Sequence, residues 1–307
     1  MAGASGVIGR RLIPMLVQAG HHVGGMTRSA ERAEAVSAMG ATPSVCDVYD
    51  VDALNAVVVA ARPDVVIHEL TDLPLRIDPR KGETFDGTNR IRREGTRNLV
   101  DAAVAAGARR IVAQSIAFAY RADGEAVKSE DAPLFEDAPE PFADTVAAVR
   151  ALEETVTATP GIEGLVLRYG IFYGPGSTYA ADGHYAAEVK RRRFPIVGKG
   201  TGIFSFIHVD DAAGATVAAV DRGSPGIYNI TDDDPAPVSE WLPQYADALG
   251  AKKPYRVPKF VGRIAAGQYA VMLMTELRGA SNERAKAELG WRPRYASWRQ
   301  GFREALG

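Results

Sequence analysis

The stretch that decides the fold lies at the start of the chain, and it reads Gly3-Ala4-Ser5-Gly6-Val7-Ile8-Gly9. It runs directly into residues 10–19, where apolar side chains recur at helical spacing. Glycines at this spacing allow a tight turn, a close approach of the backbone to a pyrophosphate, and close packing of the helix on a sheet. The free N–H groups and positive dipole end of the helix suit phosphate. A turn that merely begins a helix could carry the same glycines. The pattern of the residues after the helix therefore has to distinguish a dinucleotide-binding loop from an ordinary turn.

Short apolar runs alternate with helical patterns after this helix, which is typical of βαβ units in a parallel sheet. The run at 64–70 is almost continuously apolar, as expected for a strand that is covered on both faces. We expect strands at 22–26, 44–46, 64–70, 110–115 and 164–169, and helices at 10–19, 29–39, 51–61, 88–106 and 143–158. The fold predicted is α/β, a Rossmann-like doubly wound parallel sheet with a smaller C-terminal substrate lobe.

The regular alternation ends after Tyr173. We therefore expect residues 1–173 to form a dinucleotide-binding domain, to which 203–231 return. Residues 174–202 and 232–307 would form the substrate-binding lobe.

The start of the chain conflicts with this fold. Only Met1 and Ala2 precede Gly3, whereas a central first strand of about five residues belongs immediately before the glycine loop. We expect a truncated, mis-started or replaced first strand, whose loss would leave two neighbouring strands unpaired.

Composition excludes several classes of protein. Of the 307 residues, 46% are hydrophobic and 24% charged, which is typical of a globular chain and not of a disordered one. The 36 basic and 38 acidic side chains nearly cancel, so we expect neither nucleic acid nor a membrane as partner, but a small-molecule substrate. The one cysteine, Cys46, has no partner for an internal disulfide and predicts a cytoplasmic location.

Arginines follow the second strand at the position that selects the cofactor. An acidic residue there would bind the ribose hydroxyls of NAD, but this chain has Arg28, with Arg32 one helical turn later. A guanidinium fork suits the additional 2′-phosphate of NADP. We predict NADP as the cofactor, with NAD as the alternative. In the competing interpretation, Arg28 and Arg32 are only solvated residues at the start of a helix.

Several motifs in the same order resemble the extended short-chain dehydrogenase/reductase superfamily, in its NAD-dependent epimerase/dehydratase branch. The resemblance covers nearly the whole chain. The motifs are the glycine loop, Cys46-Asp47-Val48, Gly95-Thr96-Arg97-Asn98-Leu99, the run from Leu167 to Gly176, Phe206-Ile207-His208-Val209-Asp210-Asp211, and the tail from Ser281 to Pro293.

The resemblance implies roles for particular residues. Asp47 and Val48 would line the adenine pocket, Leu70 and Thr71 would pass beside the nicotinamide ribose, and Tyr169 would lie near the nicotinamide. It also implies a homodimer through the helices at 88–106 and 143–158. His208, Asp210 and Asp211 match a motif that we interpret as structural rather than catalytic.

The catalytic pattern of the family departs here. Its Tyr-x-x-x-Lys pair transfers a proton while hydride moves. If Glu154 is the family's glutamate, Val146 and Arg150 take the two positions; if Glu153 is, Thr145 and Val149 do. Neither register gives Tyr and Lys, although Arg150 could still hydrogen-bond the cofactor ribose.

The family's catalytic serine at the end of a strand is also absent from its usual position. Ile116 stands at the family's catalytic serine position, so Ser115 becomes the leading polar candidate, because it lies at the carboxyl end of a strand. Tyr120 is the next candidate. Further possible donors are Tyr169, Tyr173, Asp182 and His184, for which a structural role is the stronger interpretation.

Other positions also depart from the family pattern. Gly170 and Ile171 stand where many nucleotide-sugar enzymes carry Phe and Asn, which favours a more apolar pocket. Arg92 stands where the family has an asparagine three residues before Gly-Thr. The basic run at 190–193 would contact an anionic end of the substrate or form a solvated helix end.

Two functions emerge as hypotheses. The first is an NAD(P)-dependent oxidoreductase or epimerase/dehydratase-like enzyme that acts on a small, fairly apolar carbonyl or alcohol metabolite with a non-standard proton donor. The second is a non-redox protein of the same fold: a dinucleotide-sensing module, or a lyase, isomerase or cyclase that uses the pocket without hydride transfer.

Overall fold

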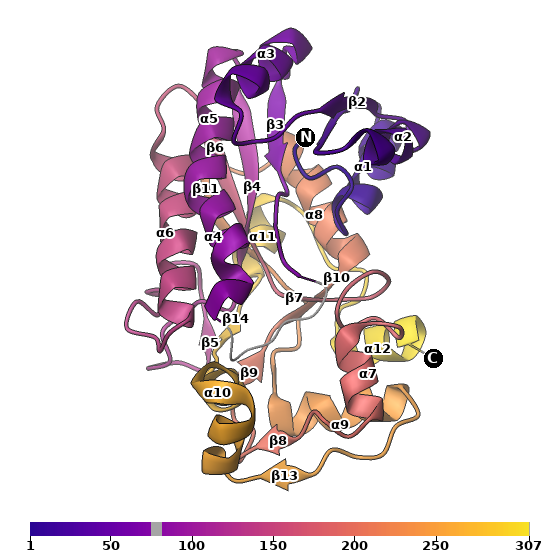
Figure 1. Ribbon diagram of the computed structural model, residues 1–307, viewed down its shortest axis with the longest axis vertical. Helices are drawn as coiled ribbons and strands as arrows, with labels where there is room; N and C mark the ends of the chain where they lie inside the picture. The colour runs from indigo at the N-terminus through magenta and orange to yellow at the C-terminus, as the bar shows by residue number, and fades with distance from the viewer. Residues whose placement is uncertain (75–81, 307) are drawn as a thin grey trace.

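The computed structural model describes residues 1–74 and 82–306. Figure 1 shows an elongated molecule with a sheet between helices in its upper part and a smaller lobe below. The strands of the sheet are parallel and run in the order β2-β1, then β3-β4-β6-β11. They are β1 (Gly24–Thr27), β2 (Thr42–Val45), β3 (Val65–His68), β4 (Arg110–Ile116), β6 (Glu163–Tyr169) and β11 (Gly226–Ile230). The predicted Rossmann-like fold is confirmed.

Met1 and Ala2 occupy the place of the central first strand. Ala2 forms parallel bridges to Met26 of β1 and to His68 of β3. The Ala2 N–H donates to the Ile67 carbonyl at 2.8 Å, and the Met1 carbonyl accepts from the Met26 N–H at 2.8 Å. Of the expected alternatives, the structure shows a replacement of the first strand, because the backbone groups of Met1 and Ala2 join the two halves of the sheet.

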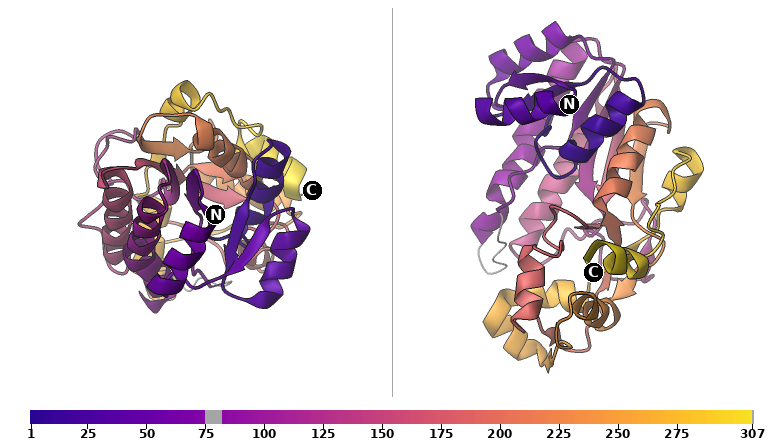
Figure 2. Two further views of the ribbon diagram at one scale, coloured as in Figure 1. Left: turned by 90° about the horizontal axis from the view of Figure 1, so that it is seen from above. Right: turned by 90° about the vertical axis from the view of Figure 1, so that its right-hand side faces the viewer.

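Two layers of helices cover the sheet (Figure 2). One face carries α1 (Gly9–Gln18), α2 (Ala30–Ala38) and α8 (Val209–Asp221), and the other carries α3 (Val51–Ala61), α5 (Thr96–Ala105) and α6 (Phe142–Ala158). Ser29 and Asp50 cap α2 and α3, as their positions in the sequence indicate, because each side chain accepts a hydrogen bond from a backbone N–H of the first turn. These layers bury both faces of the parallel sheet.

The lower lobe has an aromatic core around Trp241 and Phe206, whose ring centroids lie 5.2 Å apart. Its helices are α7 (His184–Lys190), α9 (Val238–Ala248), α10 (Lys259–Thr275) and α12 (Trp298–Leu306). Its strands are β7 (Ile171–Tyr173), β8 (Ile196–Val197), β9 (Ile203–Phe204), β10 (Phe206–His208), β12 (Ala236–Pro237) and β13 (Arg256–Val257).

The helix expected at 88–106 consists of three pieces. They are α4 (Asp86–Arg90), a π-helical turn η2 (Ile91–Gly95) and α5. A single π turn inside a helix is frequent at functional sites. The remaining elements are η1 (Gly82–Phe85), β5 (Val127–Lys128), β14 (Gly279–Ala280) and α11 (Glu283–Glu288). Within residues 1–74 and 82–306, no helix has the length and apolar character needed to cross a membrane.

A buried ion pair fixes α6 on the sheet. The Arg168 guanidinium on β6 donates to both carboxylate oxygens of Glu153 on α6, at 2.8 and 2.6 Å, and these side chains are 4% and 5% exposed. Glu154, the next residue, has a side chain that is 67% exposed. Glu153 is therefore the glutamate that faces the sheet, which selects the register with Thr145 and Val149 at the positions of the family's Tyr and Lys.

We predict that Glu153→Ala lowers the free energy of unfolding by roughly 3–5 kcal/mol, because it leaves the Arg168 charge buried without its partner. The matched control is Glu154→Ala, for which a change within about 0.5 kcal/mol is expected at an exposed position. Urea unfolding of both variants measures the difference. Equal losses in the two variants would contradict this assignment of the register.

Candidate active site

The glycine loop between Ala2 and α1 has no room for side chains. A Cβ atom at Gly3, whose φ is +88°, would lie 2.4 Å from the Glu69 carbonyl oxygen, and one at Gly9 would lie 2.4 Å from the Gly3 carbonyl oxygen. Ile8, which precedes α1, makes no side-chain capping hydrogen bond, and the first turn carries no acidic residue. This loop fits a pyrophosphate, because an anion can take the N–H groups of the helix start.

The other residues expected at the cofactor gather at the carboxyl ends of the neighbouring strands. Arg28 follows β1, and its guanidinium lies 3.3 Å from the Asp72 carboxylate, which follows β3; both side chains are 50% exposed. Asp47 follows β2 and accepts the Tyr49 N–H at 3.0 Å. In an open parallel sheet this edge is where ligands bind.

Further members of the set lie at the same edge. The Val48 carbonyl accepts from the Asn98 amide at 3.0 Å, and the Leu70 carbonyl accepts from the Gln114 amide at 2.9 Å. Thr71 is exposed. The structure thus brings together the residues named for cofactor binding from widely separated parts of the sequence.

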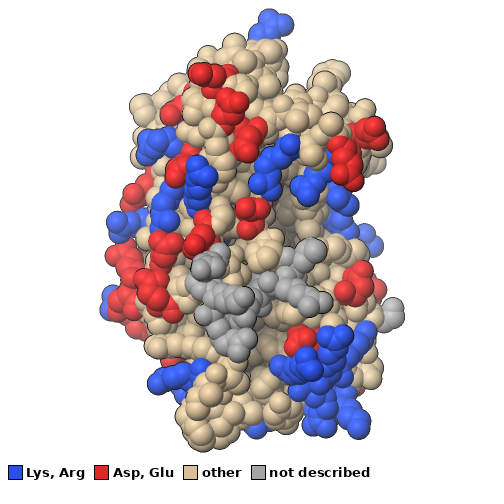
Figure 3. Space-filling view, viewed as in Figure 1, with Lys and Arg blue, Asp and Glu red and all other residues tan. Residues whose placement is uncertain are grey.

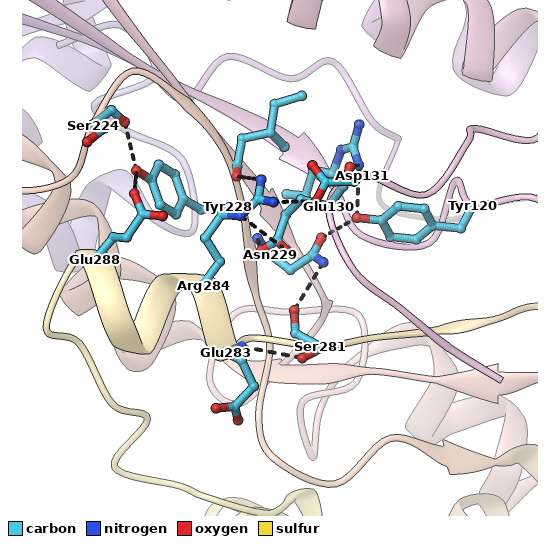
Figure 4. A network of polar contacts seen from close by, with 12 residues as sticks. Tyr120, Glu130, Asp131, Ser224, Tyr228, Asn229, Ser281, Glu283, Arg284 and Glu288 are labelled. Atoms are coloured by element: carbon cyan, nitrogen blue, oxygen red, sulfur yellow. Dashed lines mark hydrogen bonds and ion pairs between the residues drawn. The ribbon is translucent and has the colours of Figure 1, made fainter. Parts of the chain in front are cut away.

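Ser115 and Tyr120 belong to a buried polar network rather than to an open site. The Ser115 hydroxyl donates to Glu153 at 2.8 Å, and the Tyr120 hydroxyl accepts from Arg168 at 2.8 Å and donates to Asn229 at 2.6 Å. Figure 4 shows Tyr120 directed at Asn229, with Glu130 and Arg284 on the same network. Burial raises the pKa of Tyr120 to about 12. This geometry supports a structural role for both hydroxyls, not the predicted proton transfer.

Arg150 does not have the place proposed for it. Its side chain is 53% exposed and forms ion pairs with Glu136 at 2.6 Å and Glu154 at 3.4 Å. The reason is the register of α6, which directs Glu153, and not Glu154, toward the sheet. The prediction that Arg150 stands in for the family's lysine is therefore not supported.

The positions of the usual catalytic groups are held by side chains with little capacity for proton transfer. Thr145 is buried and accepts from the Asn89 amide at 3.3 Å, and Val149 is fully buried. Ile116 is half-buried at the end of β4. An aliphatic side chain cannot donate a proton, and a threonine hydroxyl is a weak acid, so Thr145, Val149 and Ile116 do not supply the general acid that carbonyl reduction needs.

Tyr169 is paired with an acid that sequence analysis did not single out. Its hydroxyl donates to Glu69 Oε1 at 2.8 Å and lies 2.5 Å from the Thr216 hydroxyl on α8. Glu69 is 7% exposed, and its Oε2 has no hydrogen-bond partner among the described residues. Burial raises the pKa of Glu69 from 4.5 to about 8, and the hydrogen bond from Tyr169 opposes this. The signal was visible as an acidic residue after the apolar residues 65–67 of the predicted strand.

The histidines of the predicted motifs are structural. His68 is buried, its Nδ1 accepts the Leu70 N–H at 3.2 Å, and burial lowers its pKa to about 4. His208 Nδ1 accepts the Asp210 N–H, and Asp211 accepts two backbone N–H groups of the segment at 294–295. The structural interpretation of this motif agrees with the geometry.

Cationic side chains gather at one place on the lower lobe. Figure 3 shows them on the lower right of the molecule, where Figure 1 labels α7 and β13. The basic run at 190–193 is exposed at the end of α7. Outside the segment 75–81, no group of three or more His, Cys, Asp or Glu side chains is arranged to hold a metal ion.

We predict that Glu69→Gln weakens the pH dependence of stability. Between about pH 4.5 and about pH 8 the folded protein keeps a proton on Glu69 that the unfolded chain has released, so wild-type stability falls as the pH rises through this window. Glutamine cannot ionise, and the variant should lose less stability between about pH 5 and about pH 8.5, by roughly 3 kcal/mol. Urea unfolding at the two pH values gives the result; parallel pH profiles would contradict it.

Comparison with known proteins agrees with the architecture. The family model described as NAD dependent epimerase/dehydratase family matches residues 1–231. Two solved structures share the fold: a Thermus thermophilus UDP-glucose 4-epimerase in complex with NAD (TM-score 0.74, 22% identity, 99% of this chain and 96% of that one), and a human epimerase family protein with NADPH (TM-score 0.76, 20% identity, 99% and 97%).

One relative is much more similar in sequence. A Streptomyces protein described as a 3-diazoavenalumate denitrifying reductase is 48% identical over 304 residues, which is 98% of each chain. Together with the glycine loop and the strand-end residues, these comparisons support a nicotinamide dinucleotide as cofactor. The chain belongs to the NAD dependent epimerase/dehydratase family of enzymes.

Proposed function

We propose that this protein is an NADPH-dependent reductase that replaces the diazo group of a small, fairly apolar carboxylic acid with hydrogen. The observation that carries the proposal is the register of α6, which leaves Thr145, Val149 and Ile116 where the family has its proton-transfer groups. The activity named for the Streptomyces relative, a denitrifying reductase of a diazo compound, indicates a reaction that fits such a site.

The reaction balances without an external proton. The substrate R–N₂⁺ and NADPH give R–H, N₂ and NADP⁺: the C–N bond breaks and its electron pair leaves with N₂, while the hydride and its pair form the new C–H bond. The bound nicotinamide supplies the hydride. Because no alkoxide forms, no acid of tuned pKa is required, in contrast to carbonyl reduction. The residues of the protein have to orient the reactants and exclude water.

The cofactor residues have distinct tasks in this proposal. The loop Gly3–Gly9, with Ser5, Gly6, Val7 and Ile8, holds the pyrophosphate at the start of α1. Asp47 and Val48 contact the adenine, and Arg28 binds the 2′-phosphate in exchange for Asp72. Leu70, Thr71 and Tyr169 lie along the nicotinamide half.

The substrate side is apolar. A cluster of mainly aromatic and aliphatic side chains packs beside Val146 on α6, and Tyr269 of α10 lies 5.6 Å from the Phe85 ring and 5.3 Å from the Phe142 ring between centroids. Ile171 is half-buried after β6. We expect this buried cluster to border the substrate, which would favour a flat or aliphatic body over a sugar nucleotide.

The other functions expected from the sequence make different demands. Reduction of a carbonyl, or oxidation of an alcohol, needs a proton donor or acceptor, and Ser115, Tyr120 and Arg150 are all engaged elsewhere. A dinucleotide-sensing or non-redox protein would bind NADPH without consuming it. A turnover experiment with a diazo acid distinguishes both alternatives from the proposed reaction.

We expect the purified protein to convert 3-diazoavenalumate and NADPH into the acid without its diazo group, with one N₂ released for each NADPH oxidised. With NADPH deuterated at C4 of the nicotinamide, mass spectrometry should find the deuterium in the product, whereas D₂O should contribute none to the new C–H bond. A panel of ketones and aldehydes serves as comparison. NADPH binding without N₂ release, or turnover of carbonyl compounds only, would exclude this function.

We predict that Arg28→Ala raises the KM for NADPH by about 10-fold or more, because a charge-assisted contact to the 2′-phosphate is lost. The KM for NADH should change little, since NADH lacks that phosphate, and this comparison within one variant is the control. Steady-state kinetics with both cofactors measures it. An equal effect on NADPH and NADH would mean that Arg28 acts on the fold of the loop and not on cofactor choice.

A further inference from the structure

The π-helical turn η2 carries an arginine whose situation differs from that of its neighbours. Arg90 is paired with Glu94 at 2.8 Å, and Arg93 is paired with Asp144. Arg92 is half-buried, and the hydrogen bond that it donates goes to a neutral acceptor, Asn89 Oδ1, at 3.1 Å. Among the described residues Arg92 has no ion pair.

Arg92 lies next to the position where the family's tyrosine would stand. Asn89, which accepts from Arg92 Nη1, donates through its Nδ2 to Thr145 at 3.3 Å and to Asp144 at 2.8 Å. The three side chains of Arg92, Asn89 and Thr145 therefore form a chain of hydrogen bonds from η2 to the face of α6 that replaces the catalytic pair.

The electrostatic surroundings of Arg92 are consistent with a cation that lacks a counter-ion. Burial lowers the pKa of Arg92 to about 10, and nearby Arg93 acts in the same direction, whereas Tyr269 and Glu153 oppose it. The Arg92 charge in turn adds to the effect of burial in lowering the pKa of His68. Glu153 is occupied by Arg168, so it does not neutralise Arg92. A half-buried cation without a counter-ion attracts an anionic ligand strongly.

The surroundings on the other side of Arg92 are apolar. Tyr269 of α10, whose pKa burial raises and the nearby Arg92 charge lowers, packs against Phe85 and Phe142. A ligand that satisfied both features would combine an anionic oxygen group with an apolar body. An aromatic or unsaturated carboxylic acid has this combination.

We propose that Arg92 binds the carboxylate of the substrate and so determines that the enzyme acts on acids. The guanidinium fork can hold two carboxylate oxygens at once, which fixes the orientation of the bound acid relative to α6. The inference rests on the proposed function for the identity of the reaction, but acid binding itself does not depend on turnover.

The test compares the acid with its primary amide in wild type, Arg92→Gln and Arg92→Lys. With 3-diazoavenalumate as substrate, Arg92→Gln should raise the KM for the acid by about 10-fold or more and leave the KM for the amide unchanged. Arg92→Lys should recover part of the loss, because it restores the charge without the fork. The matched control Arg97→Gln removes an exposed charge of α5 and should behave as wild type.

Binding without turnover separates this inference from the proposed function. Calorimetry with cinnamate and cinnamamide on the NADPH-loaded protein should show that wild type prefers cinnamate and that Arg92→Gln loses this preference. If no diazo acid is reduced but the preference depends on Arg92, the proposed function fails and the inference stands. Equal binding of acid and amide by wild type, or a change confined to the affinity for NADPH, would overturn the inference.

Discussion

The ion pair between Glu153 and Arg168 is the constraint on which the site depends. It sets the rotation of α6 about its axis, and because residues four apart lie on one face of a helix, it also decides that Thr145 and Val149 look toward the sheet. The same guanidinium orders Tyr120. The ion pair thus engages Ser115, through Glu153, and Tyr120, through Arg168, in structural hydrogen bonds.

The fold was predictable because local patterns in the sequence agreed with one another: a glycine loop before an amphipathic helix, and apolar runs at strand length. The register of α6 was not predictable, because Glu153 and Glu154 are adjacent residues of the same type and only their burial distinguishes them. The first strand could be described only as truncated, mis-started or replaced. Strand statistics demand several residues there, whereas in the structure the backbone of Met1 and Ala2 alone forms hydrogen bonds with both neighbours.

Two ionisable groups at the carboxyl edge were harder to interpret from sequence. Arg92 stands where the family has an asparagine, Glu69 lies inside an apolar run, and a sequence does not tell whether a charge is solvated, paired or isolated. The structure separates the cases. Glu69 is held by Tyr169 on the side of α8, and Arg92 by Asn89 on the side of α6. They lie among elements on opposite faces of the sheet, so the edge has a buried acid on one side and a half-buried cation on the other.

The side chains at the two replaced positions have a consequence for selectivity. If the proposed function holds, hydride transfer needs no acid, and ketones and aldehydes that reach the same nicotinamide would be reduced poorly because these two positions of α6 supply no proton. Two substitutions on one helix face, Thr145→Tyr and Val149→Lys, would restore the family's catalytic pair, although Ile116 would still stand at the serine position. Val149 is fully buried and Thr145 contacts Asn89, so introducing the pair would require new space as well as new groups.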